Sequence, residues 1–213
     1  EIQFGHIVRP THTNTSWDAA RFETVAHRWV HVAEPGFGVA VVNDSTYGHD
    51  ITRQPRQDGG TSSTVRLSII RGALFPDPQQ DQGPHHLEVG IVVGAEVHDA
   101  IVEGYRINLP ERVVPSSEAA RIAPIVTVSD PSVVVEAVKL AEDGSSDVIV
   151  RLYESLGRRI RTTVTAGFEH RGVTETDLLE REVSASALVA TDAGGTELAL
   201  RPFQIVTLRF SRT

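Results

Sequence analysis

The chain contains no cysteine and no methionine among its 213 residues. Without cysteine, a disulfide framework, a thiolate nucleophile and a cysteine-ligated zinc site are all excluded. This absence is compatible with a reducing compartment, and we expect a cytoplasmic, bacterial protein. Methionine is absent even from the first position, which is Glu1. Residues 2–8 already have the pattern of a strand. We therefore expect this chain to be a piece of a longer protein.

Long hydrophobic runs and an excess of positive charge are also lacking. No stretch approaches the ~20 apolar residues that span a bilayer, and no basic segment precedes an apolar run at the N-terminus. Acidic residues outnumber basic ones by 28 to 20, which gives a formal net charge of −8 at pH 7. These charges are interspersed, which argues against a surface that neutralises phosphates or anionic lipid. We expect neither nucleic acid nor a membrane as a partner.

Short apolar runs rich in Val, Ile and Thr dominate the chain, and Gly, Pro, Asp and Asn bound them, as is typical of strands and turns. The strands that we expect cover residues 36–42, 64–70, 86–93, 102–108, 133–140, 147–153, 158–166, 178–183, 197–200 and 203–210. The turn at 142–145 predicts a hairpin between its two neighbouring runs. Only residues 117–121 look helical, and they are too few for a stable helix. The predicted class is all-β, built from antiparallel sandwiches.

A change of composition marks the expected domain boundary. Residues 110–123 are rich in Pro, Ser, Glu and Ala, which indicates a loop or linker. We place residues 1–125 in part of a large β-sandwich domain. Residues 126–213 form a smaller C-terminal β-sandwich, in the usual size range of such domains.

The segment around Trp29 combines an aromatic ring with hydrogen-bonding groups. In a strand, His27, Trp29 and His31 lie on one face, because every second side chain points the same way. Such a set suits sugar recognition, since a ring covers apolar C–H faces while polar groups bind hydroxyls. The alternative is a tryptophan and histidines packed in the core, and taken singly each residue fits that interpretation better.

A polar turn follows the buried strand at 36–42. It contains the candidate substrate-proximal residues Asn43, Asp44, Tyr47, His49 and Asp50. Rigid scaffolds present binding residues in such loops. Asn and Asp also favour turns for purely local reasons, and without further information that interpretation is the stronger one.

No metal site or catalytic acid pair is predicted within the chain. A polar loop at 76–86 ends in His85 and His86, which in a strand would point to opposite faces and would not chelate one ion. A glycosidase pair needs two carboxyl groups roughly 5 to 9.5 Å apart, one of them with a raised pKa. Asp44 with Asp50 is a conceivable pair, as is Asp77 with Asp81, but loop carboxylates usually face water.

An arginine cluster in the second half admits two interpretations. It comprises Arg151, Arg158, Arg159 and Arg161, which suggest either an anion site or solvated ladders of ion pairs. The ladder is the expected outcome, because acidic partners are available at Glu154, Glu169 and Glu180.

Several segments of the chain, taken in their order along the sequence, resemble the C-terminal portion of family 38 glycoside hydrolases, the α-mannosidases. The similar segments are Trp17-Asp18-Ala19-Ala20-Arg21-Phe22-Glu23, His27-Arg28-Trp29, Glu34-Pro35-Gly36-Phe37-Gly38-Val39-Ala40, Asn43-Asp44-Ser45-Thr46-Tyr47-Gly48-His49-Asp50, Leu67-Ser68-Ile69-Ile70-Arg71-Gly72-Ala73, Pro76-Asp77-Pro78, Asp81-Gln82-Gly83-Pro84-His85, Val150-Arg151-Leu152-Tyr153-Glu154 and Leu200-Arg201-Pro202-Phe203-Gln204-Ile205. The chain departs from the commoner pattern at Ser45-Thr46, where Cys-Lys is frequent, and at Leu87, where an aromatic is usual.

The resemblance implies a galactose-mutarotase-like supersandwich portion followed by a smaller sandwich. It also implies that the catalytic machinery of a retaining enzyme lies upstream, in an α/β domain with an Asp nucleophile and a zinc ion held by Asp and His. No stretch here matches those motifs, so the resemblance implies no catalytic residue, metal ligand or cofactor in this chain.

The leading hypothesis is therefore a noncatalytic region that packs on its own catalytic domain and helps to wall an α-mannoside site. One alternative is an autonomous carbohydrate-binding module that uses Trp17, Trp29 and Tyr47. The other is a structural sandwich that mediates homo-oligomerisation.

Overall fold

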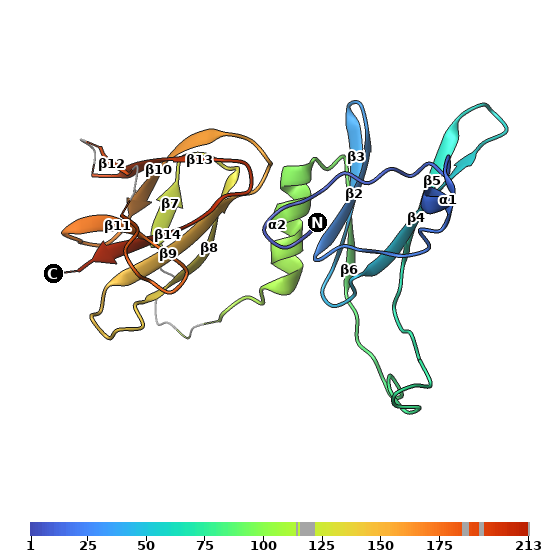
Figure 1. Cartoon of the computed structure of the whole chain (residues 1–213), viewed down its shortest axis with the longest axis horizontal. Coiled ribbons are helices and arrows are strands. Elements are labelled where there is room, and N and C mark those ends of the chain that lie inside the picture. The colour runs from blue at the N-terminus through green and yellow to red at the C-terminus, as the bar shows by residue number, and fades with distance from the viewer. Residues whose placement is uncertain (114, 116–121, 185–187, 192–193, 213) are drawn as a thin grey trace. The chain divides into compact units, whose positions relative to one another are not determined.

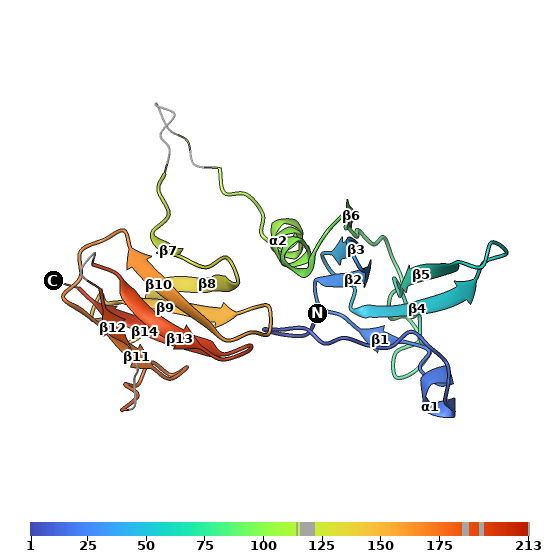
Figure 2. The same cartoon turned by 90° about the horizontal axis from the view of Figure 1, so that it is seen from above.

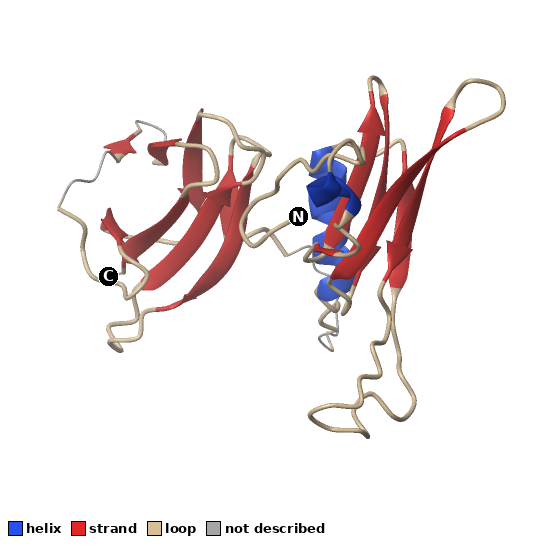
Figure 3. Ribbon diagram, turned by 45° about the vertical axis from the view of Figure 1, so that its right-hand side comes forward, coloured by secondary structure: helices blue, strands red, loops and turns tan. Residues whose placement is uncertain are grey.

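The computed structural model describes residues 1–213 except 114, 116–121, 185–187, 192–193 and 213. The chain divides into two compact units, each described here by itself (Figure 1). Unit 1 comprises Glu1–Gln3 and Ile7–Arg112, and unit 2 comprises Phe4–His6 and Val113–Thr213. Antiparallel strands predominate in both, which confirms the all-β class (Figure 3).

Unit 1 contains two three-stranded antiparallel sheets, ordered β1-β4-β5 and β2-β3-β6. Its elements are α1 (Ser16–Ala19), β1 (Thr24–Val25), β2 (Trp29–Glu34), β3 (Phe37–Asn43), β4 (Gly48–Pro55), β5 (Thr61–Leu67), β6 (Val89–Val93) and α2 (Val97–Asn108). The predicted strand at 36–42 is confirmed as β3. The strands expected at 64–70 and 86–93 are present with shifted bounds, as β5 and β6.

Helix α2 corrects the prediction of a strand at 102–108. The helix begins five residues earlier, at Val97, and buries Ala100, Ile101 and Gly104, which is the spacing of one helical face. The Asp99 carboxylate accepts a hydrogen bond of 2.8 Å from the Glu96 backbone amide at its start. The β-branched residues of 102–108 suggested a strand, but packing decides otherwise, because α2 lies against β2 and β3. The short helical candidate at 117–121 lies outside the described residues.

Unit 2 contains two four-stranded antiparallel sheets, ordered β12-β13-β10-β7 and β11-β14-β9-β8. Its strands are β7 (Val126–Val128), β8 (Val133–Leu140), β9 (Val148–Glu154), β10 (Ile160–Ala166), β11 (Gly172–Thr176), β12 (Val189–Ala190), β13 (Thr196–Leu200) and β14 (Ile205–Ser211). The hairpin predicted around 142–145 is confirmed by the pairing of β8 with β9, and Gly144 adopts the positive φ of +74° that its turn needs.

The core of unit 2 consists of side chains from both sheets. Its buried members are Val133, Val148, Val150, Leu152, Val164, Leu198, Leu200, Val206, Leu208 and Phe210. This inward set is the apolar face that alternation along the strands predicts.

The strand expected at 178–183 is absent, and that prediction is wrong. The Asp177 carboxylate instead accepts hydrogen bonds from the backbone amides of Leu179 and Arg181, at 2.8 and 3.0 Å, and closes a turn. The strand lies earlier, at Gly172–Thr176, where β11 pairs with β14. Its polar sequence carries little apolar alternation, so only the pairing with β14 reveals it.

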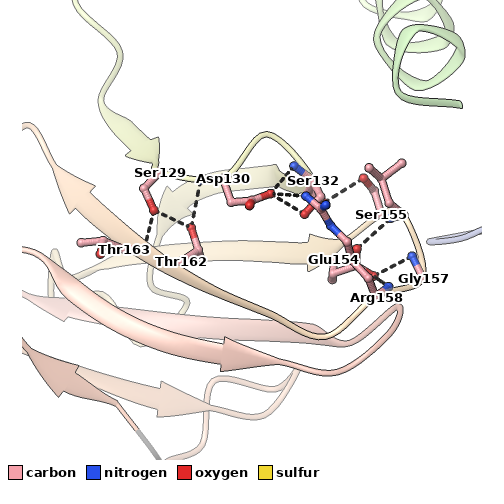
Figure 4. Close-up of polar contacts among 10 residues, drawn as sticks. Ser129, Asp130, Ser132, Glu154, Ser155, Gly157, Arg158, Thr162 and Thr163 are labelled. Atoms are coloured by element: carbon pink, nitrogen blue, oxygen red, sulfur yellow. Dashed lines mark hydrogen bonds and ion pairs between the residues drawn. The ribbon is translucent and has the colours of Figure 1, made fainter. Parts of the chain in front are cut away.

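Glu154, at the end of β9, is fully buried and holds a loop together. Its carboxylate accepts hydrogen bonds from the backbone amides of Leu156, Gly157, Arg158 and Phe203, at 2.8 to 3.1 Å. Figure 4 shows it turned toward the amides of Gly157 and Arg158. A buried carboxylate needs such donors, so its role is structural.

Candidate functional site

The polar turn after β3 is organised by Asn43, which is buried. Its side-chain oxygen accepts hydrogen bonds from the backbone amides of Ser45 and Thr46, at 3.1 and 2.8 Å. Its backbone carbonyl accepts one of 2.9 Å from the Asn108 side chain on α2. Asn43 therefore shapes the turn from within, as local turn chemistry favours.

Asp44 connects the turn to the segment before β6. One oxygen accepts hydrogen bonds from the Ser45 hydroxyl at 2.6 Å and from the Glu88 amide at 3.0 Å. These bonds, the Ser45 contact first, hold the pKa of Asp44 below its ordinary value. The carboxylate is thus ionised at neutral pH.

His49 and Asp50 follow on β4 and point to opposite sides of its sheet. His49 is buried, lies 3.1 Å from the Thr24 hydroxyl through Nε2, and has a pKa lowered by burial. Asp50 receives two hydrogen bonds from Arg66, at 2.9 and 2.5 Å, which lower its pKa. Both side chains are engaged by neighbouring strands.

Tyr47 is the candidate that stands most open, with 54% of its surface exposed. Its ring lies 5.3 Å from the ring of His27, centroid to centroid. Within the part of the chain that the structure describes, no hydrogen bond engages the Tyr47 hydroxyl.

A groove of about 680 Å³ runs beside Tyr47. Its lining residues come from the position before β1, from the turn and the start of β4, and from the long loop between β5 and β6: Glu23, Ser45, Thr46, Tyr47, Gly48, Ser68, Ile69, Ile70, Arg71, Asp81 and His85. From the sequence, Asp81 is a conceivable carboxyl partner of Asp77, His85 is not expected to bind a metal ion with His86, and no role is predicted for Glu23 or Arg71. The only signal for these residues was their place in the segments that resemble the family.

Gly48 allows Glu23 and Ser68, which both line the groove, to approach the β4 backbone closely. A Cβ atom at this position would lie 2.4 Å from Oε1 of Glu23 and 2.9 Å from Cβ of Ser68. The Ser68 amide also donates a hydrogen bond of 2.9 Å to the Gly48 carbonyl. Only glycine fits between these two neighbours without displacing one.

Trp29 is not among the residues that line this groove. Only 3% of its surface is exposed, and it packs under α2, where a Cβ on Gly104 would approach its ring to 3.0 Å. This placement corrects the idea that Trp29 offers an open platform for a sugar ring, and matches the alternative of a core residue.

Neither Asp44 nor Asp50 has the raised pKa of a general acid. Asp44 and Asp50 both have lowered pKa values, the opposite of what a general acid needs. Among the residues that the structure describes, no group of three or more His, Asp or Glu is placed to hold a metal ion. No helix in the same residues is long and apolar enough to cross a membrane.

The arginines of unit 2 behave mostly as the ladder interpretation expected. Arg158 pairs with Asp130 and Arg161 with Glu197, each at 3.0 Å, whereas Arg151 bonds the Thr207 hydroxyl. The acidic partners differ from those expected, because Glu154 is buried and fully engaged with backbone amides.

Two family models match the chain in succession. Residues 1–79 match the "Glycosyl hydrolases family 38 C-terminal domain", and residues 132–208 match the "Glycosyl hydrolases family 38 C-terminal beta sandwich domain". The chain belongs to glycoside hydrolase family 38. Apart from Phe4–His6, the first match falls in unit 1, and the second falls in unit 2. The two matches confirm the resemblance read from the sequence.

The alpha-mannosidases to which this chain is similar are much longer than the chain. It is 36% identical to the human alpha-mannosidase 2C1 over 98% of its own length and 20% of the relative's. It is 34% identical to alpha-mannosidase G of Dictyostelium discoideum, over 99% of the chain and 19% of the relative. The chain thus spans about a fifth of the length of the curated relatives it matches.

A solved structure supports the fold of this family 38 region. The alpha-mannosidase of Enterococcus faecalis V583 superposes with a TM-score of 0.66 at 20% identity, over 98% of this chain and 23% of that one.

Proposed function

We propose that this chain is the noncatalytic C-terminal β-region of a zinc-dependent retaining α-mannosidase. The observation that carries the proposal is the pair of successive family matches, joined to relatives that are α-mannosidases of about five times the length. In this proposal, zinc and the Asp nucleophile belong to a catalytic domain outside the chain. The described residues do not fit a zinc site, so no catalytic step is assigned to them. The cytoplasmic, bacterial setting is part of the same proposal.

The region has two roles in this proposal. It packs on its own catalytic domain, and the groove beside Tyr47 forms part of the wall of the α-mannoside site. Tyr47 supports the second role, because it is exposed, lines the groove and follows a turn that Asn43 and Asp44 hold rigid. Arg71 and Asp81 add hydrogen-bonding groups to the same groove, and sugar hydroxyls need such groups.

The test uses the intact enzyme and an α-mannoside substrate. Tyr47→Phe removes one hydroxyl and Asp44→Ala releases the turn, so both should lower kcat/KM by roughly tenfold or more. Arg159→Ala, on unit 2, is the control and should leave the kinetics unchanged. If both groove variants behave like the control, the groove has no part in the substrate site.

The alternative of an autonomous carbohydrate-binding module has one observation in its favour: Trp17 is 84% exposed. Calorimetric titration of this chain with mannose and α-mannobiose separates the two functions. The proposed function predicts no binding at millimolar sugar, whereas a module would bind. Light scattering on the chain and on the intact enzyme tests the remaining alternative, homo-oligomerisation.

A further inference from the structure

The two faces of the sheet β2-β3-β6 have different surroundings. On one face Trp29, Ala40 and Val42 are buried, and α2 packs over β2 and β3 (Figure 2). The pairing register places the alternate residues of all three strands on the opposite face.

That opposite face is mainly apolar on every strand. Its side chains, called here the valine face, are Val30, Val32, Glu34, Phe37, Val39, Val41, Asn43, Val89, Ile91 and Val93. Val30 and Asn43 are buried, whereas the β6 side chains are exposed. Ile91 and Val93 are 70% and 71% exposed, and both lie on β6, whose outer edge pairs with no other described strand. An apolar edge strand left open in this way is a template for pairing with further chain.

Only part of the valine face has a neighbour in unit 1. A groove of about 340 Å³ separates Val32, Phe37, Val39 and Val41 from Ser63 and Val65 of β5. In a sandwich, the inner side chains of two sheets interdigitate and leave no such space. At β6, the valine face therefore has the composition of a sandwich interior, and no layer among the described residues covers it.

The length of the relatives favours one occupant for the exposed part of the valine face. This chain spans about 20% of them, and β2 and β3 lie within the segment that matches the family model. We propose that an apolar segment of the same α-mannosidase polypeptide, from the part that this chain does not span, covers the valine face. The inference rests on the proposed function and extends it, because it names the surface through which unit 1 is anchored. The face carries no basic residue and includes the acidic Glu34, which disfavours an anionic membrane as its occupant.

Thiol labelling in the intact enzyme tests this inference directly. Because the chain contains no cysteine, a thiol introduced by Ile91→Cys is the only one in its peptide and can be followed by mass spectrometry. Leu179→Cys, on unit 2, is a matched control, since Leu179 is 72% exposed against 70% for Ile91. With a water-soluble maleimide, the thiol at position 91 should react roughly tenfold or more slowly in the folded enzyme than in urea. The thiol at position 179 should react at similar rates in both.

Rapid labelling at position 91 in the folded enzyme would overturn the inference, as would protection that disappears on dilution, because a second copy would then be the occupant. Val93→Cys repeats the measurement at an equally exposed neighbour in case the first variant folds poorly. Activity on an aryl α-mannoside is measured on the same unsubstituted enzyme. Absent activity would count against the proposed function alone, whereas rapid labelling in an active enzyme would count against the covered face alone.

Discussion

The carboxylate of Glu154 accepts a hydrogen bond of 3.0 Å from the backbone amide of Phe203, 49 positions further along the chain. Three more amides, from the loop that follows β9, converge on the same group. One buried side chain therefore joins two loops of unit 2.

Replacing Glu154 should be costly. Glu154→Ala leaves four backbone amides without their acceptor, and we expect a loss of at least about 3 kcal/mol in the free energy of unfolding. Glu154→Gln keeps one oxygen acceptor but places its NH2 group, a hydrogen-bond donor, against backbone amides that are also donors. We therefore expect an intermediate loss in the free energy of unfolding. Urea denaturation measures both, with Glu169→Ala on the exposed surface as control. A loss below about 1 kcal/mol for the alanine variant would refute the structural role.

The close contacts around Gly48 lead to a second prediction, which concerns the stability of the chain. Gly48→Ala places a methyl group against Glu23 and Ser68, and should destabilise the chain by about 1 to 3 kcal/mol. Gly172→Ala is the matched control, because a Cβ there meets no atom within 4 Å and the backbone is unstrained. Its effect should stay within about 0.5 kcal/mol. Equal thermal shifts for the two variants would show that the close approach to Glu23 is unimportant.

The two tryptophans of the chain lie in different environments, so replacing them should have different effects on stability and on fluorescence quenching. Trp29 is buried under α2, whereas Trp17 is open to solvent. Trp29→Ala should cost about 3 to 5 kcal/mol of stability, and Trp17→Ala should cost almost nothing. In Trp17→Phe, the remaining fluorescence comes from Trp29 and should resist acrylamide quenching. In Trp29→Phe, it comes from Trp17 and should be quenched readily. Comparable quenching in both variants would contradict the burial of Trp29.

Arg209 should contribute to acid stability through two aspartates. It lies 2.6 Å from Asp143 and 2.7 Å from Asp147. The pKa of Asp143 is lowered chiefly by Ser145 and then by Arg209, and that of Asp147 by the Arg212 amide and then by Arg209. Because these values lie below those of the unfolded chain, the unfolded state binds more protons as the pH falls. The resulting stability is present above about pH 4 and is lost below it.

Arg209→Gln should therefore flatten the fall in stability between about pH 4 and pH 2, as followed by denaturation at each pH. Arg159→Gln, at an arginine with no ion pair among the described residues, is the control and should leave the slope unchanged. An unchanged slope in Arg209→Gln would place the acid sensitivity elsewhere.

Local patterns in the sequence determined much of the fold. The apolar run that becomes β3 and the turn at 142–145 between β8 and β9 were correctly predicted, because alternation and turn residues act over a few positions. The same local evidence failed at α2 and at β11. A helix with β-branched residues, or a polar strand, is stabilised by the surface it meets, Trp29 in one case and β14 in the other.

The sequence by itself thus determined the all-β class, the absence of thiol chemistry and the family 38 resemblance, since composition, periodicity and motif order are properties of the linear chain. Only the tertiary structure decided that Trp29 is a core residue, that Arg71 and Asp81 share a groove with Tyr47, and that Ile91 and Val93 of the valine face are left exposed. Each of these depends on contacts between segments far apart in sequence, and the free energy of such contacts follows from packing in three dimensions.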